Sequence, residues 1–120
     1  MDVKELMDTL LMAWRTHDDE QRRALAEKVF APSAVHRVAG ENLKFTGRDE
    51  IVANMAQVNR DQIQGAGVAF DYGKTVENDN GIYQEWTITA PDGNVLRSGR
   101  DFYVRDDEGR ITAFYMYGGV

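Results

Sequence analysis

The amino-acid sequence predicts an α+β fold in which the helices come first and the strands follow. In the first half of the chain, apolar residues recur at the three- and four-residue spacing of helices. After residue 67 apolar and polar residues alternate, as they do in strands, and Gly-containing turns separate the segments. Connections this short join neighbouring strands in an antiparallel manner. We therefore expect three helices packed against one face of an antiparallel sheet.

Three helices are expected in the first half of the chain. The first covers residues 2–17 and carries an apolar stripe that includes Trp14. The second covers residues 19–30, because its acidic start suits the positive end of a helix and Pro32 stops it. The third follows residues 46–49, Thr-Gly-Arg-Asp, which have the spacing of a capping box.

The strands are expected in two places along the chain. A short strand at residues 34–38 precedes a loop at residues 39–45. The second half holds longer strands, because Asn-Gly and Asp-Gly pairs between them favour tight hairpin turns. These longer strands are expected at residues 68–77, 82–90, 95–105 and 110–117.

Alternation along the strands predicts which side chains face the helices. On the strand at 82–90 we assign Gln84 and Trp86 to the inner face. On the next strand we assign Arg100 and Phe102 to the inner face, because that side is the more apolar one. This assignment turns Asp101 toward the outside of the sheet.

The last strand is apolar on both of its faces. We assign Tyr115 to the inner face, which places Phe114 and Met116 on the outer face with Tyr83 and Tyr103. Monomers usually avoid an exposed apolar patch of this kind. A second copy of the chain would cover the patch on both molecules at once, so we expect a homodimer through the outer face.

Length, charge and composition narrow the class of protein. The 120 residues allow a single domain, residues 1–120. Twenty acidic and fourteen basic residues give a net charge of -6, which disfavours nucleic acid and anionic membrane surfaces as partners. The sequence has no cysteine, no paired histidines and no Gly-rich phosphate loop, so we expect no metal site and no cofactor. No apolar run is long enough to span a bilayer, and we expect a cytoplasmic protein.

Short motifs spread along nearly the whole chain carry a resemblance to a known superfamily. They are the Trp14 helix with the turn His17-Asp18-Asp19, the segment 30–35, the helix start 47–51, Glu85-Trp86, Pro91-Asp92-Gly93, the segment 99–102 and the segment 109–111. Together they resemble the nuclear transport factor 2-like superfamily, which includes ketosteroid isomerase, scytalone dehydratase and the SnoaL-like polyketide cyclases. The resemblance implies a cone-shaped α+β barrel, with three N-terminal helices packed in a curved mixed or antiparallel sheet.

The resemblance also places the catalytic positions of ketosteroid isomerase on this chain. The oxyanion-hole tyrosine of that enzyme falls on Trp14, its proton-abstracting aspartate on Val38 and its protonated aspartate on Arg100. All three residues differ from those of the family, and a valine side chain can take no proton. We therefore do not expect the family's isomerase mechanism in its usual form.

Three polar residues are the catalytic candidates. His36 shares a strand face with Val38 and could act as a general acid or base, or could be a histidine at the cavity rim with one hydrogen bond. Arg100 could donate to a ligand oxygen or belong to an internal ion pair. Asp101 could serve as an acid or base if a one-residue slip turned it inward. The candidate ligand-binding residues are Trp14, Val38, Asn54, Met55, Gln84, Trp86, Phe102 and Tyr115. The aromatic ones could instead fill the core, and the two amides could be ordinary polar groups with hydrogen-bond partners.

Two functions of different classes remain open at this point. The first is a SnoaL-like small-molecule-binding protein that acts as an isomerase or cyclase on a carbonyl or polyketide-like compound by proton transfer. The second is a non-catalytic module that uses the same fold to bind a ligand or a protein partner. In both cases the expected ligand is small and apolar and offers an oxygen acceptor to Arg100.

Overall fold

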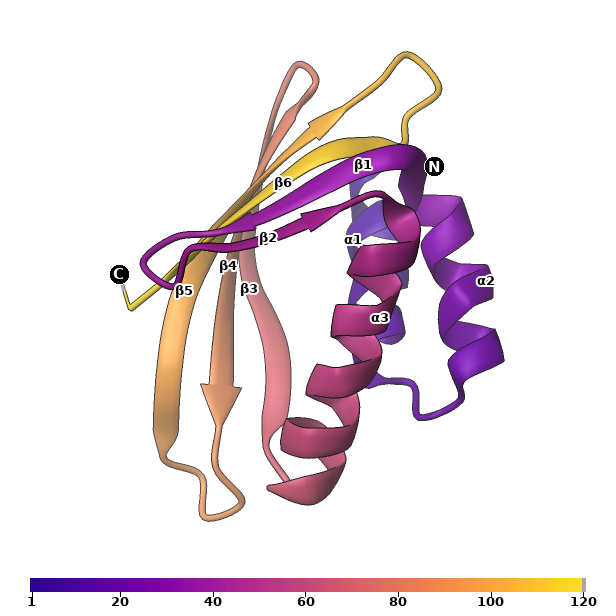
Figure 1. The fold of residues 1–120 in the computed structure, drawn as a ribbon. Helices are drawn as coiled ribbons and strands as arrows, with labels where there is room; N and C mark the ends of the chain where they lie inside the picture. Colours follow the sequence, from indigo (N-terminus) through magenta and orange to yellow (C-terminus); the bar gives the residue numbers. More distant parts are fainter. Residues whose placement is uncertain (120) are drawn as a thin grey trace.

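Three helices lie on one side of a curved six-stranded sheet in the computed structural model, which describes residues 1–119 (Figure 1). The third helix continues directly into a π-helical segment, labelled η1. None of the described helices is both long and apolar enough to cross a membrane. The helical elements are α1 (Val3–Arg15), α2 (Asp19–Val29), α3 (Arg48–Val58) and η1 (Asn59–Gly65).

The sheet is mixed and open. Its strand order is β2-β1-β6-β5-β4-β3, in which β1 and β6 are parallel and every other neighbouring pair is antiparallel. Because β2 and β3 remain as free edges, the sheet does not close into the barrel that the resemblance implied. The strands are β1 (Phe30–Val38), β2 (Leu43–Thr46), β3 (Ala69–Asn78), β4 (Gly81–Thr89), β5 (Val95–Arg105) and β6 (Ile111–Gly118).

Two predictions about the sheet are wrong. The expected loop at residues 39–45 includes most of strand β2, which pairs with β1 after a turn where Gly40 and Asn42 adopt positive φ angles of 79° and 54°. The sheet is also not wholly antiparallel, because β1 pairs with β6 in parallel. A parallel pair needs a long connection, and the elements from β2 to β5 supply it.

Side-chain caps explain where the first two helices begin. Asp2 and Asp18 accept hydrogen bonds of 2.8 Å from the backbone amides three residues later, at Glu5 and Gln21. The predicted capping box of α3 is not formed, because Gly47 is its N-cap and no side chain caps the helix. Instead, the Glu50 carboxylate accepts a hydrogen bond of 3.0 Å from the amide of Thr46.

The inner face of β5 is the opposite of the predicted one. In the sheet, Gln84 lies opposite Asp101 and Trp86 lies opposite Gly99. Residues opposite each other share a face, so Asp101 points inward together with Trp86, while Arg100 and Phe102 point outward. Counting apolar residues failed here because the inner face of β5 carries a glycine and a hydrogen-bonded carboxyl group.

The faces of β6 also differ from the prediction. The pairing of β5 with β6 shifts register near Arg105 and Ile111. Ile111, Phe114 and Met116 therefore all point inward, although regular alternation would place Ile111 on the face opposite to the other two. Tyr115 consequently lies on the outer face and is exposed. The predicted outer patch therefore loses Phe114, Met116 and Tyr103, all of which pack in or against the core.

Candidate functional site

A cavity of about 440 Å³ lies between the inner face of the sheet and the segment formed by α3 and η1. This volume suits a small organic ligand. The exposed surface of the cavity wall is mainly apolar, but about half of its side chains are charged or carry a hydrogen-bonding group. Its residues are Trp14, His36, Val38, Glu41, Leu43, Phe45, Asn54, Gln57, Val58, Asp61, Gln62, Ile63, Val68, Phe70, Trp86, Ile88, Arg97 and Met116.

His36 is the buried titratable group of this wall. Its ring stacks on Phe114, with the centroids 3.8 Å apart, and lies against Phe45 on the other neighbouring strand. The side chain is 1% exposed, and neither ring nitrogen has a hydrogen-bond partner. Burial, with a smaller contribution from Arg37, lowers the pKa of His36 to about 4. The imidazole is therefore neutral at pH 7, and the expectation of a rim histidine with one hydrogen bond is wrong.

Asp101 lies behind the cavity wall. One carboxyl oxygen accepts a hydrogen bond of 2.9 Å from Trp86 Nε1, and the other accepts one of 2.7 Å from the Tyr103 hydroxyl. Burial raises the pKa of Asp101 to about 7, although these two hydrogen bonds act in the opposite direction. Because both oxygens are engaged and the group is fully buried, Asp101 holds the indole of Trp86 in place and does not face the cavity.

A buried polar chain continues from Asp101 toward Trp14. The Tyr72 hydroxyl lies 3.4 Å from that of Tyr103, which itself donates to Asp101. Trp14 Nε1 is close enough to the Tyr72 hydroxyl to influence its pKa, but it is not in hydrogen-bonding geometry and has no partner. The hydrogen-bonded chain therefore runs from Trp86 through Asp101 and Tyr103 to Tyr72 and ends next to Trp14.

Two glycines make room for the polar end of the cavity. Gly99 lies opposite both Trp86 and Gly118, and a Cβ on Gly99 would collide with the indole of Trp86. A Cβ on Gly118 would likewise collide with the guanidinium of Arg97. That guanidinium lies over the Trp86 ring, 6.0 Å from its centroid. Arg97 is not among the site residues predicted from the sequence, and the glycines at 99 and 118 are the sequence signal that could have identified it.

The other predicted site residues are divided between the cavity, the core and the outer face. Val38 and Asn54 line the cavity with Trp14, His36 and Trp86. Met55 is fully buried in the core and is not part of the cavity wall. Gln84 is buried on the inner face of β4, but its amide bonds to the backbone of the irregular part of β3.

Three predicted site residues lie on the outer face, where they cannot reach the cavity. Arg100 is exposed and its guanidinium lies 5.9 Å from the centroid of the Tyr83 ring. Phe102 and Tyr115 are also exposed on this face, so the face assigned to these three residues from the sequence is wrong. Within residues 1–119 no group of three or more His, Cys, Asp or Glu side chains could hold a metal ion.

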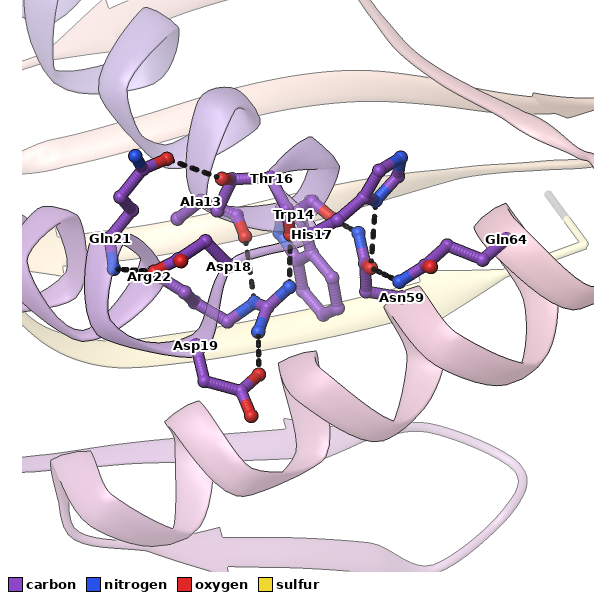
Figure 2. A network of polar contacts seen from close by, with 10 residues as sticks. All are labelled: Ala13, Trp14, Thr16, His17, Asp18, Asp19, Gln21, Arg22, Asn59 and Gln64. Atoms are coloured by element: carbon purple, nitrogen blue, oxygen red, sulfur yellow. Dashed lines mark hydrogen bonds and ion pairs between the residues drawn. The ribbon is translucent and has the colours of Figure 1, made fainter.

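Asn59 joins the cavity-lining segment η1 to the end of α1 (Figure 2). Its side-chain amide donates a hydrogen bond of 2.7 Å to the carbonyl oxygen of Trp14. Its carbonyl oxygen accepts from Gln64 Nε2 at 2.7 Å and from His17 Nδ1 at 3.1 Å. His17 thus donates to Asn59, a side-chain contact that its position at the end of the first helix did not predict. The network positions the backbone of Trp14 against the start of η1.

Arg22 supports the same corner from α2 (Figure 2). Its buried guanidinium donates to the carbonyl oxygens of Ala13 and Thr16 at the C-terminal end of α1. Another nitrogen of the group donates to Asp19 at 2.7 Å. These contacts satisfy carbonyl groups that have no partner within the helix itself. The end of α1 that carries Trp14 is therefore held from two sides.

The combination of an open curved sheet, three helices and an internal cavity is the nuclear transport factor 2-like fold. This confirms, at the level of the fold, the resemblance seen in the sequence. No protein-family model and no curated protein matches the sequence.

Solved structures with this fold come from several bacteria. A SnoaL-like family protein from Agrobacterium tumefaciens, described provisionally as an isomerase, is 23% identical, with a TM-score of 0.84 over 98% of this chain and 97% of that one. A protein from Sinorhizobium meliloti, described provisionally as a polyketide cyclase, is 15% identical, with a TM-score of 0.70 over 97% and 96%. A protein from Catenulispora acidiphila with a ketosteroid isomerase-like fold, in complex with trimethylamine, is 14% identical, with a TM-score of 0.72 over 94% and 84%.

Proposed function

We propose that this protein binds a small, largely apolar carbonyl compound in the cavity and catalyses proton transfer on it, as an isomerase or cyclase does. The observation that carries the proposal is His36, which lies in the cavity wall with both ring nitrogens unpartnered. A buried polar group without a partner costs about 1–3 kcal/mol. A ligand group that contacts the imidazole nitrogens would reduce this cost, so the site favours a ligand with a polar or acidic C–H group at this position.

The low pKa of His36 decides what its imidazole can do. With a pKa of about 4, the neutral ring is as weak a base as a carboxylate. It takes a proton from the carbon next to a carbonyl only if the developing negative charge on the oxygen is stabilised. Trp14 also lines the cavity and its Nε1 has no hydrogen-bond partner, so this N–H is the candidate donor to that oxygen.

The proposed reaction returns the proton to the ligand. The α C–H bond breaks, its electron pair forms the enolate, and the proton binds one nitrogen of His36. In a ligand with a β,γ double bond the enolate is conjugated, and His36 gives the proton to the γ-carbon, which yields the α,β-unsaturated isomer. In a ligand with a second carbonyl group, the enolate carbon bonds to that carbonyl carbon, the C=O π bond breaks, and His36 gives the proton to the new alkoxide oxygen, which closes a ring without an outside reactant. The provisional descriptions of the Agrobacterium and Sinorhizobium proteins as an isomerase and a cyclase agree with this class of reaction.

The test uses 2-tetralone, an apolar ketone whose α-hydrogens exchange with solvent. Calorimetry measures its binding, and NMR in D₂O measures the exchange rate at the α-carbons. We expect the protein to accelerate exchange at least tenfold over buffer. His36→Phe keeps an aromatic ring on Phe114 but removes the imidazole nitrogens, so it should weaken binding only modestly and abolish the acceleration. Arg100→Met, a substitution on the outer face, is the control and should change neither.

Two results would contradict the proposal. If 2-tetralone binds without faster exchange, the cavity binds ligands and does not catalyse proton transfer, which is the function of the second class. If 2-tetralone does not bind, or if His36→Phe exchanges as fast as the unmodified protein, His36 is not the group that defines the site. Trp14→Phe separates the donor from the base, because it should slow exchange more than it weakens binding.

A further inference from the structure

Arg97 is the single guanidinium or ammonium group in the described wall of the cavity. It projects from the inner face of β5, where it lies opposite Ile88 of β4, another residue of the wall. Its side chain is 44% exposed, so it marks the solvent-facing end of the cavity, whereas His36 lies buried in the wall. The cavity therefore offers a permanent positive charge at its open end and a neutral N–H in its buried wall.

The position of the Arg97 guanidinium is defined by its neighbours. Its cationic face covers the Trp86 ring, whose N–H is anchored to Asp101. The space it occupies exists because residue 118 is a glycine. Within residues 1–119, one carboxylate contacts it, and the distance from Arg97 Nη1 to Glu41 Oε1 is 3.2 Å. The other N–H groups of the guanidinium are therefore available to a ligand.

Glu41 is well suited to be replaced. It lies in the turn between β1 and β2, beside the positive-φ residues Gly40 and Asn42, and its side chain is 47% exposed. A single-contact ion pair at such exposure contributes little net stability. A ligand carboxylate could instead pair with the guanidinium through two parallel hydrogen bonds, which is a stronger geometry. Exchanging Glu41 for such a ligand therefore costs the protein little.

We propose that the ligand is an oxo carboxylate, whose carboxylate displaces Glu41 from Arg97 while its carbonyl group lies beside His36. This inference rests on the proposed function, because it names the substrate class of the same cavity. The apolar body of the ligand lies between the two polar ends, against Trp86 and the rest of the apolar wall. Glu41 is then a placeholder that neutralises Arg97 when the cavity is empty of ligand.

The test compares a γ-oxo carboxylate with neutral analogues. The probes are 3-benzoylpropionate, its amide 3-benzoylpropionamide, and propiophenone, which has the ketone but no carboxyl group. Calorimetry at low salt measures their affinities. We expect the protein to bind the carboxylate at least tenfold more tightly than the amide. Arg97→Met, which keeps the stem over Trp86, should remove this preference and leave affinity for the amide within about twofold.

Two further variants sharpen the comparison. Glu41→Gln removes the competing carboxylate and should raise affinity for 3-benzoylpropionate several-fold without raising affinity for the amide. Arg100→Met removes an arginine three residues along the same strand, on the outer face, and should leave all affinities unchanged. Thermal unfolding of each variant shows that the protein remains folded.

The results separate failure of this inference from failure of the proposed function. If propiophenone and the amide bind as tightly as the carboxylate, the cavity accepts carbonyl compounds but Arg97 is not an anion anchor, and only this inference is overturned. If tetramethylammonium binds and the carboxylate does not, the carboxylates of Glu41 and Asp61 make the cavity prefer cationic ligands, and the inference is overturned. If none of the carbonyl probes binds, both the inference about Arg97 and the proposed function are overturned.

Discussion

At the scale of single residues, the site depends on two buried groups, His36 and Asp101, whose pKa values are shifted in opposite directions. His36 is neutral because burial disfavours its charged form, and Asp101 retains its proton to higher pH for the same reason. Neither effect comes from a salt bridge. Gly99 matters as much as either, because its missing side chain gives the Trp86 indole the space from which it reaches Asp101. The cavity therefore depends on the sizes of residues that never touch a ligand.

These two groups predict opposite dependences of stability on pH. Between about pH 4 and 7 the unfolded chain has released the Asp101 proton while the native state keeps it. The contribution of Asp101 to the free energy of unfolding therefore decreases as pH rises. Between about pH 4 and 6.5 His36 is protonated in the unfolded chain and neutral in the native state. The contribution of His36 to the free energy of unfolding therefore increases as pH rises. The two contributions oppose each other in the unmodified protein.

Single substitutions separate the two contributions. Urea unfolding from pH 4.5 to 7.5 should show that Asp101→Asn makes stability increase more steeply with pH, because the His36 contribution remains alone. His36→Phe should make stability decrease with pH relative to the unmodified protein. Each difference should exceed about 1 kcal/mol across the range, since one unit of pKa shift corresponds to about 1.4 kcal/mol. Parallel stability curves for all three proteins would contradict the environments described for these side chains.

At the scale of elements, the cavity depends on how α1 is joined to η1. The described contacts between them centre on Asn59, which begins the π-helical segment. π-helical segments are uncommon and occur often at functional sites. Here the segment carries Asp61, Gln62 and Ile63 into the cavity wall. The hydrogen bonds of Asn59 therefore hold the wall rather than the ligand.

Asn59→Ala should destabilise the protein by about 1–3 kcal/mol, because it leaves the buried carbonyl of Trp14 without its side-chain donor. It should also speed amide hydrogen exchange in residues 59–65 more than in the β4 and β5 strands. Gln64→Ala is the matched control, since it removes one of the two donors to Asn59 from an exposed position and should cost less than half as much. Equal effects of the two substitutions would mean that Asn59 is not the centre of the network.

Local signals predicted the elements, while pairing between distant segments decided the site. Helix starts at Asp2 and Asp18 and the Gly-containing hairpin turns follow from short-range chemistry, and the structure has helices and strands close to these expectations. The face of β5 could not be predicted in this way, because Asp101 is tolerated inside only through donors on Trp86 and Tyr103. The parallel partner of β1 lies about 80 residues later in the chain, and no local pattern identifies it.

At the scale of the whole molecule, the outer face of the sheet remains the surface to explain. Phe102 is 44% exposed there, and its ring contacts those of Tyr83 and Tyr117 edge to face. The same face carries both signs of charge, with Arg100 opposite Glu85 on the neighbouring strand. A second copy related by a two-fold axis could cover the aromatic rings and pair these charges. We therefore still propose a homodimer through this face, although with different residues from those first predicted.

Phe102→Glu should disrupt this dimer, because it places a charge in the middle of the aromatic row. Light scattering at micromolar concentration should give twice the monomer mass for the unmodified protein and the monomer mass for the variant. Met12→Glu, which changes an apolar side chain of similar exposure on α1, should leave the mass unchanged. A monomer mass for the unmodified protein would contradict the proposal.

The position of β6 has a consequence for how the chain acquires its structure during synthesis. β6 lies between β1 and β5, so it joins the β2-β1 hairpin to the β5-β4-β3 meander. Until residues 111–118 have been made, these two parts of the sheet share no hydrogen-bonded edge. Such long-range pairing is slow and leaves apolar strand edges exposed in the meantime. Nascent chains that stop before β6 should therefore be the species most prone to aggregate and to engage chaperones.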